Sequence, residues 1–205
     1  MTLHWFSLVA AMVLLWFPML ARPRVPHEIE ELVRWAPAKP LAMMKVWLNW
    51  VDLARAGLGT WLLLEKTFEF DGDDERAVWT VFVLRAGIFA AGLALQTVHF
   101  KRVLYLVAPA FYLTGITLLL GKDFAGAFAV CVGWGFALAL RNGQLVLPVM
   151  APALALSSFV LSEPGLLLVL NFALLILPPL LGVLFLRGPR LLDSLTASRE
   201  PERGA

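Results

Sequence analysis

Seven long apolar runs, separated by short polar connections, dominate the pattern of hydrophobic and polar positions along this chain. A helix needs roughly 20 apolar residues to cross a hydrocarbon core of about 30 Å, and each run comes close to that length. The predicted spans are residues 3–21, 43–64, 77–98, 103–120, 124–140, 144–162 and 165–186. The pattern predicts an all-α fold with a single domain over residues 1–205: a polytopic membrane helical bundle of seven transmembrane helices.

Composition supports this interpretation. Of the 205 residues, 60% are hydrophobic and 16% are charged, a profile that is rare among soluble domains of this size. The single cysteine, Cys131, excludes a disulfide framework or a cysteine metal cluster within one chain.

The basic residues predict an orientation for the seven spans. Alternating connections place twelve Lys and Arg residues on one side and three on the other, where eight acidic residues also fall. The side with twelve carries Arg22, Arg24, Arg34, Lys39, Lys45, Lys101, Arg102, Arg141, Arg187, Arg190, Arg199 and Arg203, and the other side carries Lys66, Arg76 and Lys122. By the positive-inside rule, the N-terminus lies outside and the C-terminus is cytoplasmic. The expected location is a bacterial-type cytoplasmic (inner) membrane.

Two segments on the cytoplasmic side are longer than a turn. Residues 22–42 form a predicted amphipathic linker, which either lies on the lipid headgroups or is an ordinary connecting helix with a solvated face. Residues 187–205 form a cytoplasmic tail. On the outside, the acidic run at 71–75 lacks the full spacing of an EF-hand loop, which favours a solvated turn over a divalent-cation site.

The second span contains a polar stripe. On a helical wheel, Asn49, Asp52 and Arg55 fall with Ala56 and Gly59 within an arc of about 120°. Trp47, Trp50, Val51, Leu58 and Trp61 occupy the opposite side. The stripe is therefore expected to face the bundle, with small residues that allow a neighbouring helix to approach closely, while the tryptophans face lipid.

A second arginine is predicted at the same depth. Arg55 lies about 15 Å from either end of its span, and Arg85 lies about 14 Å inside the third span, on one face with Gly92 and Gln96. Asp52 is expected to pair with Arg85 or to be shared between both arginines. This leaves one positive charge without an acid in any span.

Three interpretations of that surplus charge remain open. In the first interpretation, an Asp52–Arg85 ion pair links two spans, while Arg55 donates to backbone carbonyls left without partners at a proline kink, or to water. Alternatively, the charge binds an anionic lipid or a carboxylate substrate at the midplane. In the third interpretation, another subunit supplies the acid. Asn49, Asp52, Arg55, Arg85 and Gln96 are thus the candidate ligand-binding or buried ion-pair cluster.

Two further spans have distinctive residues. Tandem prolines at Pro178 and Pro179 remove two backbone donors, which predicts a helix break in the seventh span. The fifth span, residues 124–140, carries Gly126, Ala129, Gly133 and Ala137, which suit close helix contact, and it is expected to be the most enclosed helix.

Motifs for common chemistries are missing from the sequence. The three histidines, His4, His27 and His99, fall at span ends or in a connection, and no HExxH, Walker A or GxSxG motif occurs. We therefore predict no metal site and no cofactor. The basic residues lie beside the membrane, so nucleic acid is not implied as a partner.

These observations favour a non-enzymatic subunit or assembly factor of a larger membrane complex, with membrane lipids and other membrane subunits as partners. The alternative is a small transporter or lipid-binding protein with a midplane site for an anionic ligand. An intramembrane transferase that uses Asp52 as a base ranks lowest, because a carboxylate paired with arginine is a poor proton acceptor.

Overall fold

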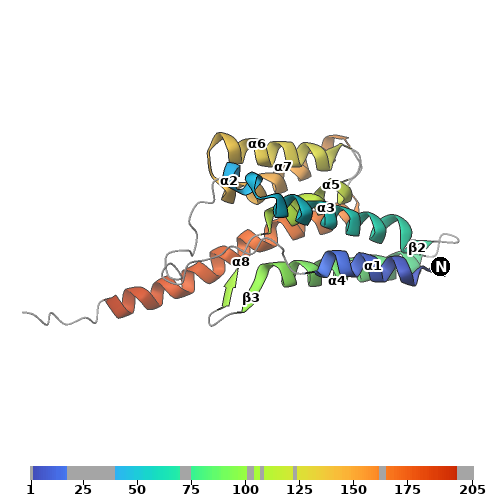
Figure 1. Cartoon of the computed structure of the whole chain (residues 1–205), viewed down its shortest axis with the longest axis horizontal. Coiled ribbons are helices and arrows are strands. Elements are labelled where there is room, and N and C mark those ends of the chain that lie inside the picture. Colours follow the sequence, from blue (N-terminus) through green and yellow to red (C-terminus); the bar gives the residue numbers. More distant parts are fainter. Residues whose placement is uncertain are drawn as a thin grey trace, which may run out of the picture.

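The fold is an elongated bundle of helices, which Figure 1 shows as a computed structural model of the chain. The structure describes residues 2–17, 40–69, 75–100, 104–106, 109–121, 124–161 and 165–197. Most of the linker at 22–42, the acidic residues 71–74 and the end of the tail lie outside the described residues, so the expectations for those segments stay predictions.

The described part contains eight α-helices, which confirms the all-α class. They are α1 (Trp5–Trp16), α2 (Pro40–Lys45), α3 (Trp47–Trp61), α4 (Glu75–Thr97), α5 (Ala110–Leu120), α6 (Ala125–Ala139), α7 (Val146–Leu161) and α8 (Leu166–Ala197). A π-helix, η2 (Leu62–Lys66), continues α3, and a 3₁₀ turn, η3 (Gly143–Leu145), precedes α7. Helices α6 and α7 form one layer, α3 and α5 the next, and α1 and α4 the third, with α8 packed against α4, α5 and α7 (Figure 1).

Two short antiparallel strand pairs occur at helix ends. Strand β1 (Thr2–Leu3) pairs with β2 (Phe68–Glu69), and β3 (Val98–Phe100) pairs with β4 (Leu104–Leu106). The first pair fixes the start of α1 beside the end of η2, where the backbone N–H of His4 also donates to Thr67 O at 3.0 Å.

Two helices of the described part have the length and apolar composition to cross a membrane, Glu75–Thr97 and Gly143–Val160. Helices α1, α5 and α6, and the Leu166–Leu181 part of α8, are apolar but shorter. Two such helices are only weak support for a membrane location. The structure therefore confirms an all-α fold without establishing seven spans.

Proline explains where two helices depart from the predicted spans. Helix α1 ends at Trp16 instead of continuing to residue 21, because Phe17 precedes Pro18 and adopts φ −58° and ψ 128°. The span predicted at 103–120 begins as strand β4, and its helix starts only after Pro109, at Ala110. Helix α1 has 12 residues and rises about 18 Å, and Ala11 and Leu15 near its end are fully buried in the bundle.

The helix break predicted at Pro178 and Pro179 is wrong. Helix α8 is continuous through both prolines and extends to Ala197, past the predicted end at residue 186. Proline removes only its own donor, and Leu174, Leu175 and Pro178 of the same segment are buried in the bundle, which holds the chain in helical geometry.

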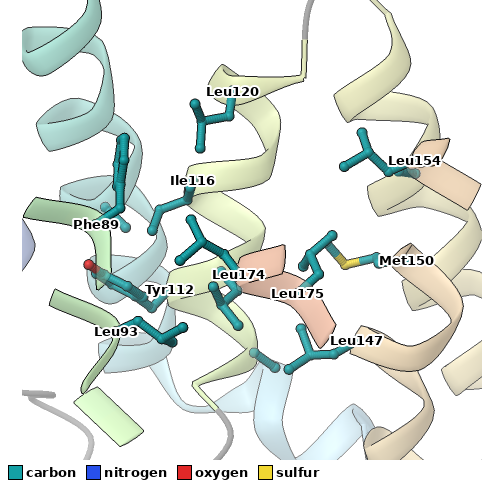
Figure 2. Packing of buried hydrophobic residues seen from close by; sticks show 14 of the residues in the cluster. Phe89, Leu93, Tyr112, Ile116, Leu120, Leu147, Met150, Leu154, Leu174 and Leu175 are labelled. Atoms are coloured by element: carbon teal, nitrogen blue, oxygen red, sulfur yellow. The ribbon is translucent and has the colours of Figure 1, made fainter. Parts of the chain in front are cut away.

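The most enclosed helix is α5, so the expectation that residues 124–140 would be most enclosed is wrong. Nine of the 11 residues of α5 are buried, against six of 15 in α6. Figure 2 shows Tyr112, Ile116 and Leu120 of α5 packed among side chains of α4, α7 and α8. The small residues of α6 still make the predicted close contact, since a Cβ at Gly133 would lie 2.9 Å from Val146 O of α7.

Close packing of α3 on α5 leads to a first prediction. A Cβ at Gly115 would lie 2.3 Å from the backbone oxygen of Leu53, whereas exposed Gly87 in α4 has no atom within 4 Å of its added Cβ. We expect Gly115→Ala to lower the free energy of unfolding by about 1–3 kcal/mol through overpacking.

The matched control is Gly87→Ala, which should raise stability by up to about 1 kcal/mol, because alanine is the better helix former. Denaturant unfolding of both variants in one detergent measures the difference. Equal effects would show that α3 and α5 are not in contact at Gly115.

Candidate functional site

The polar stripe of α3 faces the interior, as predicted. Asp52 is fully buried, and Asn49 and Arg55 are each only 8% exposed. On the opposite side, Trp47 is 69% and Trp50 49% exposed.

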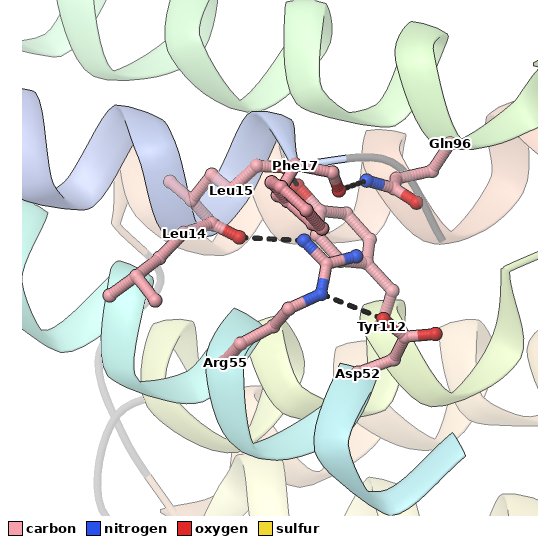
Figure 3. Close-up of polar contacts among 7 residues, drawn as sticks. All are labelled: Leu14, Leu15, Phe17, Asp52, Arg55, Gln96 and Tyr112. Atoms are coloured by element: carbon pink, nitrogen blue, oxygen red, sulfur yellow. Dashed lines mark hydrogen bonds and ion pairs between the residues drawn. The ribbon is translucent and has the colours of Figure 1, made fainter. Parts of the chain in front are cut away.

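Asp52 pairs with Arg55 of its own helix. Arg55 Nε donates to Asp52 Oδ1 at 2.7 Å, a spacing of three residues that places both side chains on one face (Figure 3). Asp52 therefore neutralises an arginine within α3, and the predicted Asp52–Arg85 pair between two helices is wrong.

The second partner of Arg55 is the end of α1. Arg55 Nη1 donates to Leu14 O at 2.7 Å, and the guanidinium lies 5.6 Å from the centre of the Tyr112 ring. The last carbonyls of a helix have no partner within the helix and carry a partial negative charge. A cation that donates hydrogen bonds is well suited to this position.

Two other helices bind the same end. Tyr112 of α5 donates its hydroxyl to Leu15 O at 3.1 Å, and Gln96 Nε2 of α4 donates to Phe17 O (Figure 3). We call this arrangement the α1 junction: the carbonyls of Leu14, Leu15 and Phe17 with the side chains of Asp52, Arg55, Gln96 and Tyr112. It joins α1 to three helices, α3, α4 and α5.

Gly92 makes room for the α1 junction. A Cβ at this position would lie 2.5 Å from the Tyr112 hydroxyl and 3.2 Å from Leu15 O. Glycine at position 92 thus allows α4 to approach α1 while Tyr112 reaches its acceptor.

Asn49 performs the same task at another helix end. Helix α2 stops at Lys45, and Asn49 Nδ2 donates to Met43 O at 2.7 Å. Trp50 Nε1 donates to Met44 O at 2.8 Å. Side chains from the first turn of α3 therefore bind two of the last carbonyls of α2, across the interruption at Val46, whose N–H also donates to Met43 O.

Arg85 lies apart from the α1 junction. Its Nη2 donates to Leu64 O of η2 at 2.6 Å, its guanidinium lies 5.5 Å from the Phe68 ring centre, and Glu65 contributes a favourable electrostatic interaction. Leu64 is nine residues after Arg55, so the two arginines bind at different levels of the same helical segment. The predicted cluster of three charges at one depth is wrong, because the long Arg85 side chain extends toward the end of η2.

Sequence reasoning missed Tyr112. The sequence contains two tyrosines, Tyr105 and Tyr112, and both lie in the predicted span 103–120. A hydroxyl in an apolar run needs a hydrogen-bond acceptor, and this requirement was a usable signal. Trp16, whose Nε1 donates to Ile88 O at 3.0 Å, was missed as a second link between α1 and α4.

In this arrangement the polar side chains bind one another or backbone oxygens. Asp52 and the end of α1 balance the charge of Arg55, and the donors of Asn49, Arg85, Gln96 and Tyr112 bind backbone oxygens. Across the described ranges, no group of three or more His, Cys, Asp or Glu residues is placed to hold a metal ion.

Comparisons of the chain with protein-family models, with curated proteins and with solved structures give no match.

The pairing of Asp52 with Arg55 leads to a second prediction. Arg55→Met should cost about 3–5 kcal/mol of stability, because it leaves the buried Asp52 charge without its partner. Adding Asp52→Asn removes that charge, so the two substitutions should show a coupling of about 0.5–3 kcal/mol in a double-mutant cycle.

The control cycle combines Asp52→Asn with Arg85→Met. These residues share no hydrogen bond, and their effects on unfolding should add within about 0.5 kcal/mol. A coupling larger in the Arg85 cycle than in the Arg55 cycle would contradict the observed pairing.

Proposed function

We propose that the protein is a polytopic integral membrane protein that acts as a non-enzymatic subunit or assembly factor of a larger membrane complex. The observation that carries this proposal is how the buried polar side chains are used. Buried Asn49, Arg55 and Gln96 donate to backbone oxygens of other helical segments, as does half-buried Arg85, and Asp52 pairs with Arg55. Buried polar groups used in this way stabilise a fold.

The outward faces supply the second support. Large apolar side chains are exposed on several helices and at their ends, among them Phe6 (88%), Phe124 (79%) and Phe159 (81%). Extensive exposed apolar surface is typical of proteins that contact lipid or other protein chains. The twelve basic residues that alternation places on one side favour an inner-membrane location with the N-terminus outside.

The alternative function, transport or binding of an anionic ligand, has one observation in its favour. Arg85 hydrogen-bonds a carbonyl and, within the described ranges, no carboxylate. Arg55, in contrast, already has a carboxylate and a helix end as partners, which makes the α1 junction a poor receptor for an anion.

Native mass spectrometry of the protein, purified in mild detergent from its own membrane, tests the proposal. We expect a second membrane polypeptide to co-purify in a fixed ratio. Recovery of the chain alone, under conditions that preserve known complexes of the same membrane, would contradict the subunit proposal.

The same spectra also test the alternative function, binding of an anionic ligand. An anionic lipid or solute that is retained by the wild type and lost from a folded Arg85→Ala variant would support ligand binding. Gly87→Ala is the matched control, because exposed Gly87 lies two residues from Arg85 on α4 and makes no side-chain contact.

A further inference from the structure

Three buried polar atoms at the α1 junction have no hydrogen-bond partner among the residues that the structure describes. They are Asp52 Oδ2, Arg55 Nη2 and Gln96 Oε1. The side chains are deeply buried, with exposed fractions of 0% for Asp52, 8% for Arg55 and 0% for Gln96. Buried polar atoms in native proteins nearly always have a partner, either a protein group or a bound molecule.

The three atoms belong to groups that meet at one place. Arg55 and Gln96 bind carbonyls three residues apart at the end of α1, and Asp52 is held by Arg55 at 2.7 Å. In Figure 3, the free nitrogen of Arg55 and the free oxygens of Asp52 and Gln96 lie on the same side of the guanidinium. Two helices, α3 and α4, therefore contribute free polar atoms to one site beside the end of α1.

The hydrogen-bond donors and acceptors of the free atoms determine which ligand can bind at the site. Arg55 Nη2 offers a donor, while Asp52 Oδ2 and Gln96 Oε1 are acceptors only. A matching ligand must donate two hydrogen bonds and accept one. Water does this, and buried waters typically make about three hydrogen bonds to polar groups that would otherwise be unsatisfied.

An anion does not match these atoms. A phosphate or carboxylate would accept a bond from Arg55 Nη2, but its oxygens would face a carboxylate oxygen and an amide oxygen. The charge of Arg55 is also already balanced by Asp52 and by the end of α1.

We infer that the α1 junction binds one buried water molecule, which donates to Asp52 Oδ2 and Gln96 Oε1 and accepts from Arg55 Nη2. The long side chains of Arg55 and Gln96 allow the small adjustment that such a molecule needs. This water completes the hydrogen bonding where α1, α3 and α4 meet. The inference does not depend on the proposed subunit role.

A structure of the wild-type protein at about 2 Å resolution tests the inference. We expect a single density peak about 2.6–3.2 Å from Arg55 Nη2 and from both free oxygens. In Gln96→Met, which removes one acceptor, the peak should be lost or weakened. Thr80→Ala, on the exposed side of the same helix, is the matched control and should retain it.

Two results would overturn the inference. One is continuous or larger density that fits an acceptor-only anion at Arg55 Nη2. The other is an empty site in which Arg55 Nε and Nη2 bind both oxygens of Asp52 as a bidentate pair. The wild-type map decides between these outcomes even if Gln96→Met does not fold.

Discussion

The constraint on which this structure depends is that the carbonyls at a buried helix end must find donors. Helix α1 ends after 12 residues, and Leu14, Leu15 and Phe17 present their oxygens to the bundle interior. An unpaired buried carbonyl costs about 1–3 kcal/mol, a large share of a typical folding free energy, and Leu15 at this end is fully buried. Side chains from α3, α4 and α5 remove that cost and, by doing so, fix how four helices meet.

The same solution recurs at two other interruptions of the helical backbone. Asn49 and Trp50 bind the end of α2, and Arg85 binds a carbonyl of the π-helix η2. The polar residues of α3 thus connect segments on both of its sides. Their burial accounts for an acid and a base in an apolar run without requiring a substrate, and Gly92 and Gly115 supply the space that the close helix contacts need.

The sequence was sufficient to predict which face of α3 is buried, because the period of a helix depends only on residue spacing. The sequence was insufficient to predict which acidic and basic side chains form an ion pair. The depth of Arg85 was estimated from the position of its backbone, whereas its side chain extends to Leu64. Pro18 indicated that α1 ends early, but the apolar residues continue past it, and the span was predicted from those residues. At Pro178 and Pro179 the prediction gave the prolines too much weight. Helix α8 is continuous through both, because it packs against neighbouring helices.

Hydrogen–deuterium exchange of α1 tests the central claim most directly. Removing two of its three side-chain partners in the variant Gln96→Met/Tyr112→Phe should accelerate exchange in residues 12–17, while exchange in α6 and α7 stays at the wild-type rate. This result would show that the side chains that bind the carbonyls of α1 stabilise its end. Unchanged exchange in residues 12–17, or an equal increase throughout the bundle, would contradict the account.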